Sequence, residues 1–522
     1  MYTQQDSNLA RRARWLAPPV ALAAALTVIV LLSGCVGAAH SQHRTNYTGH
    51  AATQAKRTGK DAGTQNVLTL EPGRPGEALA PGAVGLSVEA DELATHDLSA
   101  NHRSLVALMR LLGPGVLRLG GNSVDYSWWT SSGESPPSWA KSVITPSDLT
   151  ALHGLLEETG WSAIIGVNLS HFNPTRAANE AQIAASILGP GLRGIELGNE
   201  PDAYGNGFLR AVSYGPTSYL ENVSAYSAAI RGADPAVQLY GPDLATQTWL
   251  ASIASAKNLP FAEITQHYYP TVYSVSSATC QATKMPEASE LLSVQVRERE
   301  NAFVGALVKD GKLAHRDVRI SETNTTGSCD VDGGPATSPV FASALWALDW
   351  VLRAANGGVT ALNFHGYFGR CEPNAVSPIC APGDAAEAAG DVIARPEYFG
   401  LLAARQLEGG RFIPVDIREG RSRHDFSAYA TIHSSETITM AIDNFSTQAP
   451  FRLRIDVPGY DSASSERLIA PSLSATDDVT FQRAAPGTRG APRPVRTKQG
   501  KDAGVFSVEL APASADVITL RR

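Results

Sequence analysis

The sequence predicts a (β/α)8 barrel followed by an all-β sandwich domain. Between residues 84 and 367, short apolar segments alternate eight times with longer amphipathic ones, as in parallel strands joined by helices. After about residue 408 the pattern changes to short strand-like segments separated by glycine, proline and serine. Two of the earlier apolar segments end abruptly in a glutamate, at Glu200 and at Glu322. The carboxyl ends of barrel strands are where chemistry is usually placed, so these two residues are the first candidates for function.

The predicted barrel strands are short apolar runs that end in polar residues. They are residues 84–90, 115–121, 163–169, 194–200, 237–243, 263–269, 318–324 and 361–367. Helical patterns occur at 104–112, 150–158, 177–187 and 341–355, and residues 396 to about 406 form the last predicted helix. A doubly wound open sheet is the alternative. It would not need eight near-equal strands, and no glycine-rich phosphate loop follows the first strand.

The predicted sandwich contains six strand-like segments. They are residues 412–417, 426–432, 437–444, 451–457, 505–510 and 516–521. An isolated strand at 67–70 precedes the barrel and is expected to join this domain. We therefore expect a joining segment at 65–82, a catalytic barrel at 83–408 and a β-sandwich at 409–522.

The N-terminus has the form of a targeting segment. Arg11, Arg12 and Arg14 precede a largely apolar run, which ends in Leu-Ser-Gly-Cys at Cys35. This ending resembles a bacterial lipobox, so residues 1–35 are expected to direct export and Cys35 to carry a lipid anchor. A plain secretory signal or an uncleaved membrane helix is the alternative. Residues 36–64 are polar and small, as in a flexible tether.

The remaining cysteines are even in number, which in an exported protein predicts disulfides. We expect Cys371 to pair with Cys380 and Cys280 with Cys329. Metal binding is the alternative, but no CxxC pair supports it. Overall composition is that of a soluble globular protein with a formal net charge of -7, which argues against a nucleic-acid binder.

The two glutamates favour a specific chemistry. They end the predicted fourth and seventh strands, which face one cleft across the barrel mouth. Retaining glycosidases use two carboxyl groups about 5–5.5 Å apart, one as nucleophile and one as acid and then base. A single glutamate at a strand end is more often part of a salt bridge, but two at matching positions favour catalysis. No metal or organic cofactor is needed for this reaction.

Five further segments carry a family resemblance. They are Leu-Gly-Gly-Asn at 119–122, Asn-Glu-Pro at 199–201, Gln-His-Tyr-Tyr at 266–269, Ser-Glu-Thr-Asn at 321–324 and Asn-Phe-His-Gly at 363–366. In this order at strand ends, the segments resemble glycoside hydrolase family 79 of the retaining clan A, which includes β-glucuronidases and heparanase-like enzymes. The resemblance covers roughly residues 65 to 522.

The resemblance implies roles for individual residues. Glu200 would be the acid/base, Glu322 the nucleophile, and Asn199 a hydrogen-bond partner of the sugar 2-hydroxyl. Tyr269, or alternatively Tyr268, would stand beside the nucleophile. The remaining substrate contacts implied are Glu89, Asp125 and His365. Among nearby residues, His267 is expected to be a hydrogen-bonded core group. The adjacent Trp128 and Trp129 are expected to divide between packing and solvent, with stacking on a sugar as the alternative.

One departure from the family pattern bears on the sugar. Members that recognise glucuronate commonly have Tyr-Gly-Gly shortly after the nucleophile, whereas this chain has no tyrosine there. Tyr367 is the candidate to supply the phenol and Arg370 the charge. We expect an exo-acting, monomeric β-glucuronidase whose partner is a carbohydrate. The alternatives are a neutral-sugar β-glucosidase or xylosidase, an endo-acting heparanase-like enzyme, and a non-catalytic carbohydrate-binding lipoprotein.

Overall fold

The structure is a computed structural model that describes residues 66 to 522 with gaps. The gaps are residues 96, 206, 208, 273, 277–280, 285–286, 328–336, 372–375, 419–425, 435 and 482–503, and the side chains of 272–286 are also not described. The predicted export segment with Cys35, the tether at 36–64, and the predicted pair Cys280 and Cys329 lie outside the described residues. Within the described part, no helix is long and apolar enough to cross a membrane.

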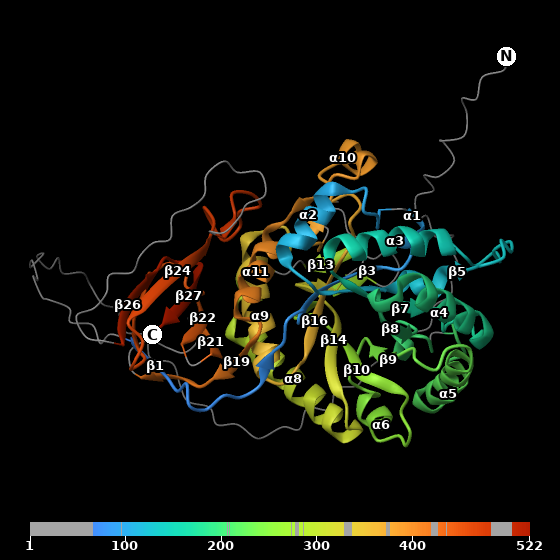
Figure 1. The fold of residues 1–522 in the computed structure, drawn as a ribbon, viewed down its shortest axis with the longest axis horizontal. Coiled ribbons are helices and arrows are strands. Elements are labelled where there is room, and N and C mark those ends of the chain that lie inside the picture. Colours follow the sequence, from blue (N-terminus) through green and yellow to red (C-terminus); the bar gives the residue numbers. More distant parts are fainter. Residues whose placement is uncertain are drawn as a thin grey trace, which may run out of the picture. The chain divides into compact units, whose positions relative to one another are not determined.

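Eight parallel strands close into a barrel in chain order, which confirms the predicted fold class (Figure 1). Each strand pairs with the next one along the chain, and the eighth pairs with the first. The strands are β3 (Val84–Glu89), β4 (Val116–Gly120), β7 (Ser162–Val167), β8 (Leu192–Leu197), β9 (Leu239–Leu244), β10 (Phe261–Tyr268), β14 (Asp317–Thr323) and β16 (Ala361–Gly366). Since all eight run the same way, their carboxyl ends meet at one mouth.

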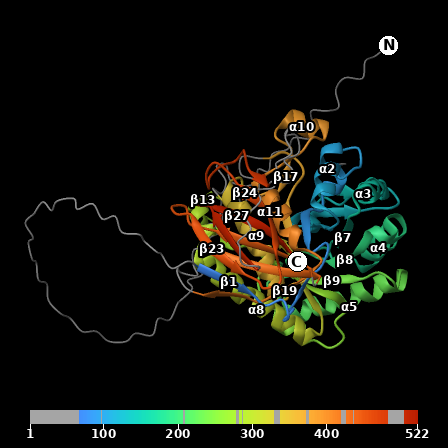
Figure 2. The same ribbon diagram turned by 60° about the vertical axis from the view of Figure 1, so that its left-hand side comes forward.

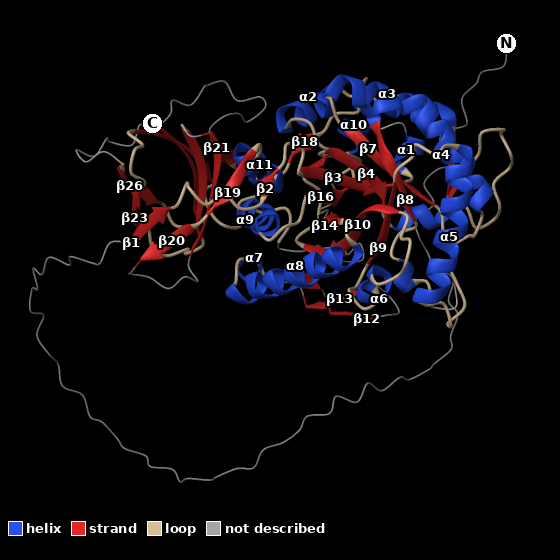
Figure 3. Ribbon diagram, turned by 60° about the horizontal axis from the view of Figure 1, so that its bottom comes forward, coloured by secondary structure: helices blue, strands red, loops and turns tan. Residues whose placement is uncertain are grey.

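A helix follows each barrel strand, and the helices lie outside the strands (Figure 3). They are α2 (Arg103–Leu112), α3 (Pro146–Thr159), α4 (Pro174–Leu188), α5 (Pro216–Ala233), α6 (Leu250–Ala254), α8 (Val294–Ala314), α9 (Phe341–Asn356) and α11 (Pro396–Ala404). Several start signals are local. Pro146 and Pro174 occupy first-turn positions, and Thr145 and Asp148 form a capping box at α3. The helices α5, α6 and α8 were not among the predicted helices.

Helix α9 is buried on nearly all sides, unlike an ordinary barrel helix. One side covers the barrel, and the other meets residues of the C-terminal sheets. The amides of Phe341 and Ala342 donate to the carbonyls of Ala475 and Leu473, and the Tyr429 hydroxyl donates to Asp349 at 2.8 Å. Residues 62–522 form one compact unit, and the core that contains α9 and the barrel also includes Leu468, Phe481 and Val517 of the larger C-terminal sheet.

The C-terminal strands form two sheets (Figure 2). The larger has the order β2-β19-β21-β22-β27-β24-β25 and the smaller β20-β1-β23-β26. Their bounds are β1 (Asn66–Leu70), β2 (Ala78–Leu79), β19 (Gly410–Ile413), β20 (Val415–Arg418), β21 (Phe426–Ser434), β22 (Thr437–Asn444), β23 (Phe451–Asp456), β24 (Ser462–Ile469), β25 (Thr480–Phe481), β26 (Val505–Leu510) and β27 (Ser514–Arg521). Alternate residues of β23 are buried, so one face of the strand supplies an apolar core. The strand β1, which precedes the barrel in sequence, pairs with β20 and β23.

Two predictions for this region were wrong. The segment 412–417 is not one strand but parts of two strands in different sheets, divided at Pro414. Proline has no amide hydrogen for a ladder, so the chain leaves one sheet there and enters the other. The strand β24 was missed because its serines and charged residues hide the alternation of apolar residues.

The described cysteines form the predicted short loop. Cys371 and Cys380 are joined by a disulfide, with Cα atoms 5.1 Å apart. This bond ties the loop after β16 to the short strand β17 (Ile379–Cys380) near the barrel mouth.

Candidate active site

The residues predicted to act on a substrate converge at the mouth of the barrel. Glu322 lies in β14 and is 7 % exposed. The hydroxyl of Tyr269, one residue beyond β10, donates to Glu322 Oε1 at 2.6 Å. His365 in β16 has Nδ1 3.7 Å from Glu322 Oε2 and Nε2 3.6 Å from the carboxylate of Glu89, the last residue of β3. Four strands of the barrel therefore contribute to one cluster.

Glu200 reaches this cluster from a turn and not from a strand. The predicted strand 194–200 is three residues too long, because β8 ends at Leu197. Gly198 has φ +84° and Glu200 itself φ +46°, left-handed conformations that cannot continue a ladder. For a non-glycine residue this costs about 1–3 kcal/mol, and such strain is often found at functional sites. The Glu200 amide holds the turn by donating to the carbonyl of Asp243 at 2.9 Å.

The turn brings Glu200 close to Glu322. One carboxylate oxygen of each and a ring nitrogen of His267 all lie within 4.8 Å of one another. His267 Nδ1 is 2.9 Å from Glu200 Oε1. The Glu200 side chain is 25 % exposed and that of Glu322 is 9 % exposed. The two carboxylates therefore share one space but have different access to solvent.

The centre of the cluster is Arg118, which the sequence reading missed. Its side chain is fully buried inside the barrel and donates to the side chains of three acidic residues. Nε is 2.5 Å from Glu196, Nη1 is 2.7 Å from Glu322 Oε2, and Nη2 contacts Asp243. Nη2 also donates to Asn199 Oδ1 at 2.7 Å. One guanidinium thus orients both the predicted nucleophile and the residue next to the predicted acid/base.

The charges around Glu322 keep it ionised. Burial alone raises the pKa of a carboxyl, but the positive charges of His267, His365 and Arg118, together with the Tyr269 hydrogen bond, outweigh it and lower the pKa of Glu322 to about 2. At neutral pH Glu322 is therefore a carboxylate, and Arg118 and Tyr269 donate hydrogen bonds to it. This is the state in which a carboxyl can act as a nucleophile.

His267 links the acids on the other side of Arg118. Its Nε2 is 2.9 Å from Asp243 Oδ1, while Nδ1 faces Glu200. Burial lowers the pKa of this imidazole, but Asp243 and Glu322 more than compensate and raise it well above its usual value. Burial raises the pKa of Glu196 to about 8, with only partial compensation from Arg118. Glu196 is therefore protonated at neutral pH, while Asp243 and Glu322 stay charged.

Two glycines make room for these side chains. A Cβ at Gly120 would collide with the Arg118 guanidinium, and a Cβ at Gly121, where φ is +71°, would collide with the Glu89 carboxylate. Glu89 also accepts the Ser123 amide at 2.8 Å. Positions 120 and 121 therefore need glycine, because a larger residue there would collide with Arg118 or Glu89.

Asp125 lies nearby on the turn after β4. Its Oδ1 accepts the Tyr204 hydroxyl at 2.6 Å, and that hydroxyl also accepts the Asn199 amide at 3.3 Å. Burial, only partly offset by the bonds from Tyr204 and Ser170, raises the pKa of Asp125 to about 7. Asp125 is thus connected to Asn199 and differs from Glu322 in being easily protonated.

Other predicted residues occupy less central positions. Tyr367 follows β16 directly, and its amide donates to Ser377 Oγ at 3.2 Å. Arg370 forms an ion pair with Asp384 at 2.6 Å, and its side chain is 41 % exposed. The ring of Tyr268 packs among helix residues, 4.3 Å from the Phe303 ring centroid. Of the two tyrosines considered for contact with Glu322, it is Tyr269 that makes it.

Glu200, His267 and Glu322 also have the spacing of a possible metal site. Both ring nitrogens of His267 already face carboxylates, at 2.9 Å each, so an imidazolium that donates to both accounts for the geometry. The donor set fits a hydrogen-bonded network better than a metal centre, because a protonated imidazole has no lone pair for a metal.

The signal for the missed residues was present in the sequence. Arg118, Glu196 and Asp243 each stand inside an apolar strand, in the segments Val-Leu-Arg-Leu-Gly, Gly-Ile-Glu-Leu and Tyr-Gly-Pro-Asp-Leu. Charged residues are almost never buried without a partner. Three of them in predicted barrel strands indicate an internal ion-pair network, although not which residue pairs with which.

Comparisons with known proteins define the class of fold. No protein-family model matches the sequence, and no curated protein sequence is similar to it. Solved structures do match across most of the chain, and the three described below are 11–17 % identical in sequence. The fold is thus that of a TIM barrel with additional β structure.

Three of these structures illustrate the similarity. A 4-O-α-L-rhamnosyl-β-D-glucuronidase from Fusarium oxysporum 12S is 17 % identical, with a TM-score of 0.59, and the match covers 87 % of this chain and 100 % of that one. A GH51 arabinofuranosidase from Xanthomonas axonopodis pv. citri is 15 % identical, with a TM-score of 0.63 over 88 % and 100 % of the two chains. A glycoside hydrolase family 44 xyloglucanase from Paenibacillus polymyxa is 11 % identical, with a TM-score of 0.58 over 88 % and 99 %.

We predict that Arg118→Met destabilises the protein strongly. The substitution leaves Asp243 and Glu322 as buried charges without their common partner, and breaking a buried pair in this way costs about 3–5 kcal/mol. Thermal and urea unfolding of the variant measure the loss. The matched control is Arg110→Met, which removes an ion pair to Glu158 at the surface. Such exposed pairs contribute about 0–1 kcal/mol, so equal effects of the two substitutions would contradict the central role of Arg118.

Proposed function

We propose that the protein is a retaining exo-β-glycosidase of the family 79 type, which cleaves terminal β-D-glucuronides. The observation that carries this proposal is the proximity of Glu200 and Glu322, with carboxylate oxygens within 4.8 Å at the mouth of a barrel. Retaining glycosidases need a separation of about 5–5.5 Å between the two carboxyl groups, whereas inverting enzymes need about 6.5–9.5 Å to admit a water. The solved structures with a similar fold include several glycosidases, which supports the same reaction class.

In this proposal Glu322 is the nucleophile. Its carboxylate attacks the anomeric carbon while the bond from that carbon to the leaving oxygen breaks, which gives a glycosyl-enzyme. Arg118 and Tyr269 each bind one of its oxygens and fix its orientation. Because the pKa of Glu322 is held low by neighbouring charges, no base is needed to activate it.

Glu200 is the acid and then the base. It gives a proton to the leaving oxygen in the first step and takes one from the attacking water in the second. Its greater exposure lets the aglycone leave and water enter. His267, which donates to Glu200 Oε1 at 2.9 Å, orients the carboxyl group.

The other residues bind the sugar. Asn199, held by Arg118, would donate to the sugar 2-hydroxyl. The carboxylates of Glu89 and Asp125 and the imidazole of His365 would receive or donate hydrogen bonds to the outer hydroxyls. Tyr367, which follows the last barrel strand, would face the sugar C6 group.

Fewer observations support the identity of the cleaved sugar. The similar fold of a rhamnosyl-glucuronidase supports glucuronate. The second candidate is an α-L-arabinofuranoside, because several arabinofuranosidases match with TM-scores of 0.61 to 0.63. The Cys371–Cys380 disulfide supports action outside the cytoplasm, where such bonds persist, in line with the proposed export and lipid anchoring through Cys35.

The roles of the glutamates can be separated by chemical rescue. We expect Glu322→Gly to lose hydrolysis of nitrophenyl glycosides, and added azide to restore turnover as a glycosyl azide of inverted configuration. Glu200→Ala should lose about 10²–10⁴-fold with substrates whose leaving group needs protonation, and much less with nitrophenyl glycosides. Azide should then give a product of retained configuration. Hydrolysis that persists in Glu322→Gly without azide would refute the proposed mechanism.

A second prediction concerns the phenol beside the nucleophile. Tyr269→Phe removes a hydrogen bond to a charged group, worth about 1.5–3 kcal/mol, so kcat/KM should fall by about 10–150-fold. Since this bond helps to keep the Glu322 pKa low, its loss raises that pKa and moves the acid limb of the pH profile to higher pH. Tyr268→Phe is the matched control, because that ring packs away from the site. A profile that does not move in Tyr269→Phe would exclude this role.

The sugar is tested by a panel of nitrophenyl glycosides with the unmodified protein. We expect the β-D-glucuronide to exceed the β-D-glucoside, β-D-xyloside and α-L-arabinofuranoside in kcat/KM by at least about a hundredfold, as in sites that bind a distinguishing polar group. Preference for the arabinofuranoside would establish the second candidate. Preference for a neutral β-glycoside would keep the mechanism and replace the sugar.

A further inference from the structure

A second cavity opens at the same end of the barrel as Glu200 and Glu322. It lies beside the segments that follow β4 and β7 and against helix α4, and has a volume of about 250 Å³. Ligand pockets for drug-sized molecules measure about 300–1,000 Å³, so this one suits a smaller ligand. No residue of the proposed catalytic pair lines it.

Aromatic rings form much of its wall. Trp139 stacks on His171, with ring centroids 3.7 Å apart and planes 9° apart, and meets the edge of Trp128 at 5.7 Å. Phe172, which is 46 % exposed, also lines the cavity. Flat aromatic surfaces at an open cavity are well suited to the apolar faces of a ring-shaped ligand.

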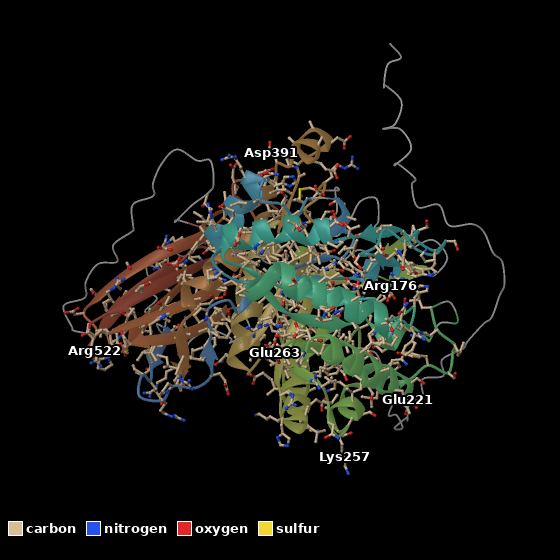
Figure 4. All side chains as sticks on the ribbon, turned by 45° about the vertical axis from the view of Figure 1, so that its right-hand side comes forward. Arg176, Glu221, Lys257, Glu263, Asp391 and Arg522 are labelled. Atoms are coloured by element: carbon tan, nitrogen blue, oxygen red, sulfur yellow. A yellow bond between two sulfur atoms is a disulfide. The ribbon has the colours of Figure 1, made fainter. Side chains whose placement is uncertain are left out.

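The wall also holds polar groups that lack partners among the described residues. Glu180 on α4 is only 6 % exposed, yet no hydrogen bond or ion pair is found for it in the described part of the chain. The buried Nε1 of Trp128 and Nε of Arg176 likewise have no hydrogen-bond partner there. Arg176, labelled in Figure 4, covers the Trp128 ring at 3.5 Å and is paired with Glu134 through Nη2 at 2.8 Å.

Such groups are unfavourable for stability. A buried polar group without a partner costs about 1–3 kcal/mol, and this cost applies to Trp128 Nε1 and Arg176 Nε. Buried groups kept at the expense of stability are typical of binding sites, where a ligand supplies the missing partners.

The state of Glu180 bears on which ligand fits. Burial raises the pKa of Glu180 to about 8, and Arg176 only partly opposes this. At neutral pH the carboxyl is therefore uncharged and offers one donor and one acceptor. A neutral polyhydroxylated ring matches a neutral carboxyl, an indole N–H and aromatic faces. An anionic ring would be repelled when Glu180 ionises.

The cavity shares a wall with the proposed active site. Asn168 and His171 line the cavity and direct side-chain atoms to the main-chain carbonyl of Asp125, at 3.0 and 3.1 Å. The carboxyl group of the same residue is directed to Tyr204, which contacts Asn199. The turn that carries Asp125 therefore separates the two sites and links them.

We propose that this cavity binds one neutral sugar ring, as a second carbohydrate subsite beside the catalytic centre. The choice of a sugar as ligand rests on the proposed glycosidase function. The consequence is that the protein prefers substrates in which the cleaved sugar belongs to a longer carbohydrate, and holds a ring of that carbohydrate away from the bond being cut.

The test uses Glu322→Gln protein, so that no probe is hydrolysed, labelled with fluorotryptophan. The protein contains eight tryptophans, and Trp128 and Trp139 signals are assigned by their substitution with phenylalanine. Methyl β-D-glucopyranoside and methyl β-D-xylopyranoside are the neutral probes, and methyl β-D-glucuronide is the anionic one. We expect a neutral probe to move both signals saturably, with a dissociation constant on the order of 1 mM.

Glu180→Leu, placed in the same protein, separates binding from folding. It should weaken the response of both signals at least about tenfold, while leaving the thermal midpoint unchanged or raising it, because an unpaired carboxyl is removed. Gln182→Leu is the matched control, an exposed position on the same helix, and should leave the response unchanged. The proposal is overturned if no probe moves the signals, if the glucuronide is preferred, or if Glu180→Leu binds as well as the parent.

Failure of this test and failure of the proposed function are distinguishable. Binding is read at Trp128 and Trp139 in a protein that does not turn over, so it does not depend on catalysis. If the protein is an active glycosidase but these tryptophans do not respond, only the proposal of a second subsite is refuted. If the tryptophans respond but the unmodified protein hydrolyses no glycoside, the cavity is a sugar-binding site and the proposed glycosidase function is refuted.

Discussion

The structure of the site depends on one buried guanidinium. Arg118 has no exposure to water, its charge is balanced by the carboxylates of Asp243 and Glu322, and its Nε donates to Glu196 on a third strand. Taking such charges out of water costs several kcal/mol per ion, and only a complete set of partners compensates. The barrel must therefore close in its correct register for Arg118 to be tolerated at all. In the closed barrel, the guanidinium of Arg118 donates to both Asn199 and Glu322. The same ion-pair network that stabilises the buried charges therefore also orients the site.

Around this centre, the two glutamates are held in opposite ways. Glu322 is in strand β14, at a register shift in its pairing with β10 and β16; it is enclosed by donors and fixed as an anion. Glu200 stands in a left-handed turn with more access to solvent and one histidine partner. A two-step displacement needs this asymmetry, because one carboxyl must remain ionised while the other exchanges a proton twice. The asymmetry arises from backbone position, since the residue type is the same.

The surrounding fold supports the site both through residues next to it and through a more distant helix. Close by, Gly120 at the end of β4 and Gly121 directly after it leave space for Arg118 and Glu89. The turn that follows carries Asp125, which connects the site to the second cavity. Further away, helix α9 is covered on both sides, by the barrel and by residues of the C-terminal sheets. A helix that is apolar all round needs a second covering layer, so the β strands belong to the same stable unit as the barrel.

The sequence by itself determined the features that depend on local periodicity. Alternating apolar and polar segments give the eight barrel strands, and the abrupt change to polar residues locates Glu200 and Glu322 near strand ends. Only the tertiary structure decided which buried charges meet, because Arg118 reaches Glu196, Asp243 and Glu322 across 78, 125 and 204 positions. It also decided that β8 stops at Leu197, after which the Glu200 amide bonds to the distant carbonyl of Asp243, and that the strands on either side of Pro414 pair in different sheets. A linear pattern records which side chains prefer burial, and only the closed barrel determines their partners.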